Sequence, residues 1–484
     1  MTTIIIFCYL GLVLCIGVLS NRFFRGTGED YFVASRSIGP FLLLMSLFGT
    51  NMTAFAILGA SGEAYHTGIG VFALMPSGAA LIIPTVFFFI GTRVWALGKR
   101  HNLLTQVQYF RRRWDSDGLG LLLFVVMIAL LIPYLLIGVM GGGITLAQIT
   151  KGQIPQWAGG LLICLVVLTY VSFGGMRSTA WANAFQTLVF MILGGVTFFV
   201  IVDKLGGLDS ALAQVAAAHP ELLIKGDNIS PIKLLTYTCI PLSVGMFPHL
   251  FTHWLTAKSA RTFRWPLMFY PLCIAIVWIP SVLLGIFGSI DFPGLKGAAA
   301  NSVLVKMIDL HAPGALAGLL AAGVFAAIMS SLDSQVLSIS NMFTQDVVRH
   351  YRKGDELSEK AQVLSGRLFV IAIFAVTYVL SLVSARSIFS LAVWSFTGFA
   401  ALFPVVVAAL FWKRSTKYGA FASVLTVAAL WCYFFFQGWK IPGYTVGMTG
   451  VMPVVVILAA SAVAMIVGSL LTKPPAKSTV DKFF

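Results

Sequence analysis

The stretch from Ala321 to Asp346 combines an apolar helix with a row of small hydroxyl side chains. At about 100° per residue, one face of this helix collects small or oxygen-bearing residues within roughly 100° of one another. They are Ala327, Ser330, Ser331, Ser334, Ser338 and Asn341, with Asp333 beside them. Close helix packing is the alternative explanation, because small residues let helices approach. Hard cations such as sodium prefer oxygen ligands, so this many positions in register favour a cation site.

The apolar segment 38–58 is interrupted at its centre by Gly49-Thr50-Asn51-Met52-Thr53. Glycine is a poor helix former, and Thr and Asn offer competing hydrogen bonds, so we expect local unwinding here. Unwound backbone in the middle of a membrane is tolerated only against protein or a cavity. The freed carbonyls of Gly49 and Met52 are therefore expected to complete a cation shell with the hydroxyls of Ser330 and Ser331.

A second interrupted segment, 231–256, carries Pro241, Gly245 and Pro248, and proline breaks a helix because it lacks a backbone donor. Two interrupted spans, five spans apart, are typical of an inverted-repeat transporter with its site between the breaks. His249 and His253 have the i, i+4 spacing of a metal pair, but no general base or third ligand accompanies them. Helix packing or substrate lining is therefore favoured over metal binding.

The composition predicts where this chemistry takes place. The 484 residues are 58% hydrophobic and 10% charged, which excludes a water-soluble globule. The length of the apolar stretches indicates helices rather than barrel strands. The sequence therefore predicts an all-α polytopic membrane protein.

We expect about 13 transmembrane helices, and the distribution of charge orients them. They lie near 2–20, 38–58, 70–94, 118–149, 155–174, 179–203, 231–256, 263–289, 313–344, 362–385, 387–411, 416–437 and 449–471. Most of the 32 Lys and Arg fall on the side that holds the connections 95–117 and 345–361, which should be cytoplasmic. The N-terminus is then outside and the C-terminus inside, in a multi-pass protein of the inner membrane.

Two function classes are not supported. No Walker loop, paired carboxylates or Ser/His/Asp order is present, so we predict that the chain is not an enzyme. The net charge of +15 is explained by basic residues at the inner membrane surface, so no nucleic-acid partner is expected. The expected partners are the lipid bilayer, sodium and a small organic solute, with the chain a monomer or weak oligomer.

Several motifs resemble the sodium/solute symporter family, whose members include proline, pantothenate, sialic acid, iodide and sugar symporters. The motifs are DYFVASRSIGPF, YVSFGGMRS, GMFPH and AAIMSSLDSQ with FTQDV, and more weakly WKRSTKYGA, together spanning residues 30–420. The resemblance implies a leucine-transporter-like 5+5 inverted repeat with one extra N-terminal and two extra C-terminal helices. The corresponding segments are 1–37, then 38–205 as the first repeat, 206–230 as an external loop, 231–411 as the second repeat and 412–484.

By position, the resemblance also implies one sodium ion between the first broken helix and the hydroxyl-bearing helix. Its ligands would be the carbonyls of Gly49 and Met52 together with Ala327, Ser330 and Ser331. Several family members have an aspartate where this chain has Asn51, and a second one where it has Asn183. These departures weaken a site for a second cation or a proton and leave the neutral site intact.

The solute is expected to be a small carboxylate with an apolar body, such as pantothenate, a monocarboxylate or an amino acid. Its charge would lie near the N-terminus of a half-helix, with an imidazole nearby. The candidate substrate residues are Thr50, Asn51, Thr53, Met75, Ser77, Phe247, His249, Trp394 and Thr397. They are mostly apolar or weakly polar, so a sugar fits less well.

The sequence predicts a sodium-coupled secondary active symporter that imports this solute by alternating access. Two alternatives stay open: a proton-coupled or uncoupled carrier, and a membrane sensor of the same fold.

Overall fold

The computed structural model describes residues 2–19, 34–226, 229–352, 358–384, 386–439, 441 and 443–484. This part of the chain is helical and contains no strand, only one parallel bridge between Ile38 and Ala257. An all-helical chain satisfies its backbone hydrogen bonds within each helix, as the interior of a bilayer requires. The predicted fold class, all-α and membrane-spanning, is confirmed at this level.

The α-helices are, in chain order, α1 (Thr2–Leu19), α3 (Pro40–Asn51), α4 (Ala60–Thr67), α5 (Gly70–Leu74), α6 (Pro76–Val86), α7 (Thr92–Arg100), α8 (Gln106–Trp114), α9 (Asp117–Ile149), α10 (Gln156–Lys204), α11 (Leu208–Ala218), α12 (Pro231–Tyr237), α13 (Pro248–Thr256), α14 (Arg264–Asp291), α15 (Val303–His311), α16 (Gly314–Met342), α17 (Arg349–Tyr351), α18 (Glu359–Val383), α19 (Ile388–Ala401), α20 (Phe403–Phe411), α21 (Lys417–Gly438), α22 (Pro453–Leu470) and α23 (Lys477–Val480). Short 3-10 or π segments connect or extend several of them, among them η3 (Phe55–Gly59), η6 (Ile240–Gly245) and η9 (Phe343–Val348).

Both predicted breaks are present. The first apolar pair, Pro40–Asn51 and Phe55–Thr67, bends by 58°, and the second, Pro231–Gly245 and Pro248–Thr256, bends by 50°. At the first break the backbone of Met52 is extended, with φ −92° and ψ 91°. At the second break Phe247 is extended before Pro248, as the residue preceding a proline prefers.

The number of spans stays partly a prediction. Among the described residues, 9 helices are long and apolar enough to cross a membrane, or up to 11 if each bent pair forms one span. Two shorter apolar helices, Thr2–Ile16 and Gln156–Ser172, fall where two more spans were expected. Large apolar side chains are exposed around the bundle, including Phe199, Val383 and Phe436. Such a surface suits contact with lipid.

The chain must reverse direction within α10. Tyr170 and Asn183 contact neighbouring residues of α16, Asp333 and Ser334. Thirteen residues of straight helix would separate Tyr170 and Asn183 by about 20 Å, so the two halves of α10 pack side by side against α16. The connection between the two expected spans, 155–174 and 179–203, falls in α10, and most side chains of residues 173–178 lie outside the described residues.

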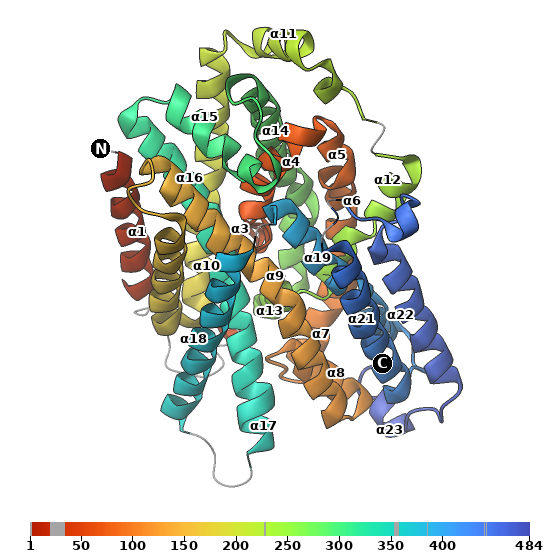
Figure 1. The fold of residues 1–484 in the computed structure, drawn as a ribbon. Helices are drawn as coiled ribbons and strands as arrows, with labels where there is room; N and C mark the ends of the chain where they lie inside the picture. The colour runs from red at the N-terminus through yellow and green to blue at the C-terminus, as the bar shows by residue number, and fades with distance from the viewer. Residues whose placement is uncertain are drawn as a thin grey trace.

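The two ends of the bundle differ (Figure 1). Helix α11 caps one end, within the predicted external loop, and α8, α17 and α23 lie at the opposite end. The connections predicted to be cytoplasmic, 95–117 and 345–361, thus meet at one end. The two termini lie toward opposite ends, as an odd number of spans requires.

Candidate functional site

The hydroxyl-bearing face of α16 lies against the first helix break. Ser330 Oγ donates to the carbonyl of Gly49, with an O–O distance of 3.1 Å, and lies 3.2 Å from the carbonyl of Ala327. Ser331 Oγ contacts the carbonyls of Ala327 and Ile328 at 3.4 and 3.0 Å. All of these residues are buried. Two hydroxyls and three carbonyls therefore lie close together here, and the contact of Ser330 with Gly49 joins α16 to the end of α3.

The absence of a side chain at Gly49 allows α10 to pack closely against α3 beside this contact. A Cβ atom at this position would lie 2.0 Å from Thr187 Oγ1, closer than any side chain tolerates. Thr187 also donates to the carbonyl of Met45, so α10 is held against the same turn of α3. Met52, at the end of α3, has left helical geometry, which turns its carbonyl away from the helical direction. The Ser330 hydroxyl thus lies within hydrogen-bond distance of the carbonyls of Gly49 and Ala327, and uncharged oxygen atoms are the ligands that a hard monovalent cation prefers. That Met52 and Ser331 complete a cation site here stays a prediction.

Asp333 is not part of this set. It faces the first half of α10, where its Oδ2 accepts a hydrogen bond of 3.1 Å from the Tyr170 hydroxyl. Next to it, Asn183 Nδ2 donates to Ser334 Oγ at 2.6 Å. Asp333 Oδ1 and Asn183 Oδ1 have no hydrogen-bond partner among the described residues, and both side chains are fully buried. A carboxylate is thus present on α16 beside Asn183, the position where several family members carry an acid.

Beneath the first break, the predicted substrate residues contribute to an aromatic cluster. Asn51 Nδ2 donates to the Tyr270 hydroxyl at 2.7 Å, and Thr53 Oγ1 accepts from the amide of Phe55. Phe247 stacks on His249 with 5.0 Å between ring centroids. His249 has no hydrogen-bond partner at either ring nitrogen among the described residues, and neither does the Thr50 hydroxyl. These polar groups are therefore buried without a partner next to the breaks.

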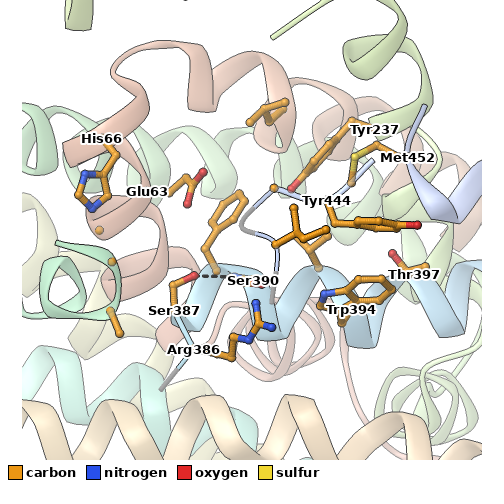
Figure 2. Close-up of a pocket in the computed structure, with 18 of the residues that line it drawn as sticks. Glu63, His66, Tyr237, Arg386, Ser387, Ser390, Trp394, Thr397, Tyr444 and Met452 are labelled. Atoms are coloured by element: carbon orange, nitrogen blue, oxygen red, sulfur yellow. Dashed lines mark hydrogen bonds between the residues drawn. The ribbon is translucent and has the colours of Figure 1, made fainter. Parts of the chain in front are cut away.

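Trp394 and Thr397 lie elsewhere, where they line a cavity of about 560 Å³ (Figure 2). Helices α4 and α12, which also line it, lie toward the end of the bundle that carries α11 (Figure 1). Four residues of α19 and its N-cap line one wall: Ser387, Ser390, Trp394 and Thr397. Their spacing of three, four and three residues places them on one helix face. This spacing is visible in the sequence, but of these four residues only Trp394 and Thr397 were predicted to bind the solute.

We call this cavity the vestibule. Its other lining residues come from distant segments and were not predicted. Glu63 and His66 come from α4, Lys233 and Tyr237 from α12, and Tyr444 and Met452 from the connection between α21 and α22. Burial raises the pKa of Tyr444, and it lowers the pKa of Arg386, the residue before the N-cap of α19, which also lines the vestibule.

Two predicted residues are at neither place. Met75 is buried at the junction of α5 and α6, and its neighbour Leu74 lines the vestibule instead. Ser77 is exposed, and its hydroxyl donates to the carbonyl of Phe72. Their role as substrate ligands therefore has no geometric support.

The vestibule is separated from the first break by a series of aromatic rings in tilted and edge-to-face contact. Phe389, which lines the vestibule, lies 5.0 Å from Phe55, centroid to centroid. Phe55 in turn contacts Phe396 at 5.2 Å, and Phe396 contacts Phe247 at 5.3 Å. A solute that moves from the vestibule to the breaks must therefore displace this aromatic floor.

The opposite end of the bundle is closed by a buried ion pair. Asp346, in η9, accepts from Arg111 Nη1 at 3.3 Å and from Thr105 Oγ1 at 2.6 Å. Arg111 also reaches Asp117, which is exposed. Helix α8 is thereby fastened to the end of the helix that carries Ser330.

We expect Arg111→Ala to lower the free energy of unfolding by about 2–3 kcal/mol. Removing one partner of a fully buried pair costs about 3–5 kcal/mol, and the exposed contact of Arg111 with Asp117 argues for the lower part of that range or just below it. In Arg111→Ala/Asp346→Asn no unpaired charge remains, so part of the loss should be recovered. Thermal unfolding of the purified variants measures both. Equal losses in the single and double variants would contradict this explanation.

No group of three or more His, Cys, Asp or Glu side chains is placed to hold a metal ion within the described part of the chain. His253 Nδ1 instead lies 2.8 Å from the carbonyl of His249, within the same helix. His253 and His249 are therefore linked by a contact within their own helix.

Residues 31–426 match a sequence profile described as "Sodium:solute symporter family". The sodium/proline symporter of Escherichia coli (strain K12) is 25% identical over 99% of this chain and 95% of its own length. The sodium/pantothenate symporter of the same organism is 26% identical over 95% of this chain and 94% of its own length.

Solved structures agree in fold. A Na+-coupled sialic acid symporter in a substrate-bound outward-open state has a TM-score of 0.80 and 19% sequence identity, covering 98% of this chain and 99% of that one. A transporter of the nucleobase-cation-symport-1 family in a closed conformation has a TM-score of 0.61 and 14% identity, with 94% and 98% covered.

Proposed function

The chain belongs to the sodium:solute symporter family, in which sodium is the coupling ion, and we propose that it imports a small organic carboxylate by alternating access. The observation that carries this proposal is the contact between Ser330 Oγ and the Gly49 carbonyl, which joins the first broken helix to α16. A sodium ion held by Gly49, Met52, Ala327, Ser330 and Ser331 would fasten these two elements together. Sodium would thereby favour the conformation that binds the solute, and the solute would favour sodium binding equally.

The architecture that goes with this proposal is the one expected from the sequence. Residues 38–205 and 231–411 form two inverted repeats, preceded by 1–37 and followed by 412–484, with 206–230 between them. The end that carries α11 and the vestibule faces outward, and the end that carries α8 faces the cytoplasm. The Arg111–Asp346 pair then closes the inner side while the vestibule is open to the outside.

The proposed solute class follows from the groups around the breaks. His249 and the Thr50 hydroxyl are buried without partners, and Asn51 carries its amide close by. The surrounding rings, with Phe247 at their centre, offer an apolar surface. The relatives named for proline and pantothenate act on compounds that each contain a carboxylate. An uncoupled carrier and a sensor find no support in these matches.

The proposal is tested by the thermal stability of the purified protein in detergent, with sodium titrated against choline at constant ionic strength. We expect sodium to raise the melting temperature, because a ligand that binds only the folded state stabilises it. Small carboxylates should add to this shift in sodium but not in choline, whereas sugars should not. A protein that responds to pH and not to sodium would contradict sodium coupling.

A further inference from the structure

Among the described residues, the lining of the vestibule of about 560 Å³ has a net positive charge. Its charged side chains are one acid, Glu63, and two bases, Lys233 and Arg386. Glu63 and Lys233 carry opposite formal charges, so they cancel in the sum of the charges that line the cavity. The remaining charge of Arg386 therefore makes the sum of the charges that line the vestibule positive.

Arg386 is held in place while most of its donors stay available. Its guanidinium lies 4.7 Å from the ring centroid of Trp439, and its Nη2 donates one long hydrogen bond of 3.4 Å to the carbonyl of Gly438. It forms no ion pair within the described ranges. A guanidinium has five donors, and stacking on an aromatic face uses none of them.

A second unpartnered donor lines the same cavity. Asn301 is only 2% exposed, and its Oδ1 accepts from the amide of Ile388 at 3.4 Å. Its Nδ2 has no partner among the described residues. Asn301 is thereby oriented at the N-terminus of α19, where the helix dipole adds positive potential. A buried amide donor without an acceptor indicates a missing oxygen ligand.

The neighbouring wall is apolar and aromatic. Trp394 and Tyr444 stack with 6.3 Å between ring centroids and 25° between planes. A Cβ at Gly438 would lie 2.5 Å from Trp394, so this glycine lets the indole pack against the segment that holds Arg386. The cavity therefore combines a cationic donor end with an apolar surface next to it.

We propose that the vestibule is a first binding station for the solute, a low-affinity site for an amphipathic carboxylate. The carboxylate is held by Arg386 and Asn301, and the apolar body lies on Trp394 and Tyr444. The aromatic floor at Phe389 separates this station from the helix breaks. The inference rests on the proposed function, because it names an outer site for the same solute. Arginine and carboxylate form charge-assisted hydrogen bonds, and an uncharged isostere cannot match them.

The test uses phenylacetate and its amide, phenylacetamide, as probes of the purified protein in sodium, with tryptophan fluorescence as the measurement. We expect saturable binding of phenylacetate, with phenylacetamide at least tenfold weaker. Arg386→Gln should weaken phenylacetate binding at least tenfold and leave phenylacetamide unchanged, and Arg386→Lys should recover part of the affinity. Asn301→Asp, which replaces the donor by a negative charge, should also weaken phenylacetate binding.

Arg93→Gln is the matched control. Arg93 likewise stacks on an aromatic ring, Phe411 at 4.3 Å, and donates one hydrogen bond of 3.4 Å to a carbonyl, but it does not line the vestibule. Binding should be unchanged in this variant. Equal affinity of wild type and Arg386→Gln for phenylacetate, or no binding of phenylacetate by wild type, would overturn the inference. Failure of the proposed function looks different, because sodium would then fail to stabilise every variant, whatever residue stands at position 386.

Discussion

In a Ser330→Ala/Ser331→Ala variant, the sodium concentration that gives half-maximal uptake is expected to rise at least a hundredfold. Each hydroxyl that contacts a charged partner contributes on the order of 1.5–3 kcal/mol, so the two together exceed the value of about 2.7 kcal/mol that corresponds to a hundredfold change in affinity. The carbonyls of Gly49 and Ala327 remain, so binding should be weakened rather than abolished. Uptake into proteoliposomes, with sodium replaced by choline at constant ionic strength, measures the change.

The double variant should still fold, because the two hydroxyls mainly contact carbonyls of their own helix. Its melting temperature in choline should therefore equal that of the wild type, and only the increment caused by sodium should be lost. Ser338→Ala is the matched control, since Ser338 lies on the same helix, is buried and has no hydrogen-bond partner among the described residues. A double variant with wild-type sodium dependence would place the ion elsewhere.

Both breaks and the hydroxyl-bearing face of α16 could be predicted because each is encoded locally. Gly49 and the prolines at 241 and 248 act on their own helix, and the periodicity of Ser330 and Ser331 needs only one helix to be understood. The periodicity of one helix does not show which residues of other helices its side chains contact, and the structure does. It places Ser330 against Gly49 and Asp333 against Tyr170.

The vestibule could not be predicted because its residues come from six separate segments. Glu63, Lys233, Asn301, Arg386 and Tyr444 have no common pattern in the sequence, and only the tertiary fold brings them to one cavity. The α19 wall is the exception, since Ser387, Ser390, Trp394 and Thr397 share a helix face. Ser77 was expected to bind the solute because it is a polar residue within an apolar span. Its side chain is instead exposed and donates a hydrogen bond to the carbonyl of Phe72.

Replacing Asp333 by asparagine is expected to lower the rate of solute uptake at least a hundredfold. This carboxyl is fully buried in the bundle, and within the described residues its Oδ1 has no partner and no basic side chain forms an ion pair with it. A buried carboxylate in that setting is stable only when it binds a cation, either a proton or a second sodium ion. The adjacent unpartnered Oδ1 of Asn183 offers that cation a further oxygen.

The measurement that distinguishes this role from simple packing is the charge moved per solute, from uptake and current on the same proteoliposomes. We expect Asp333→Asn to move one charge fewer per solute than wild type, while the stabilisation by sodium through Ser330 and Ser331 is retained. Tyr170→Phe is the matched control. It removes the hydrogen bond to Oδ2 and keeps the carboxyl, so its charge per solute should equal that of wild type. If Asp333→Asn transports at the wild-type rate and stoichiometry, the carboxyl is a neutral packing group, and one sodium ion at the α3 break suffices for coupling.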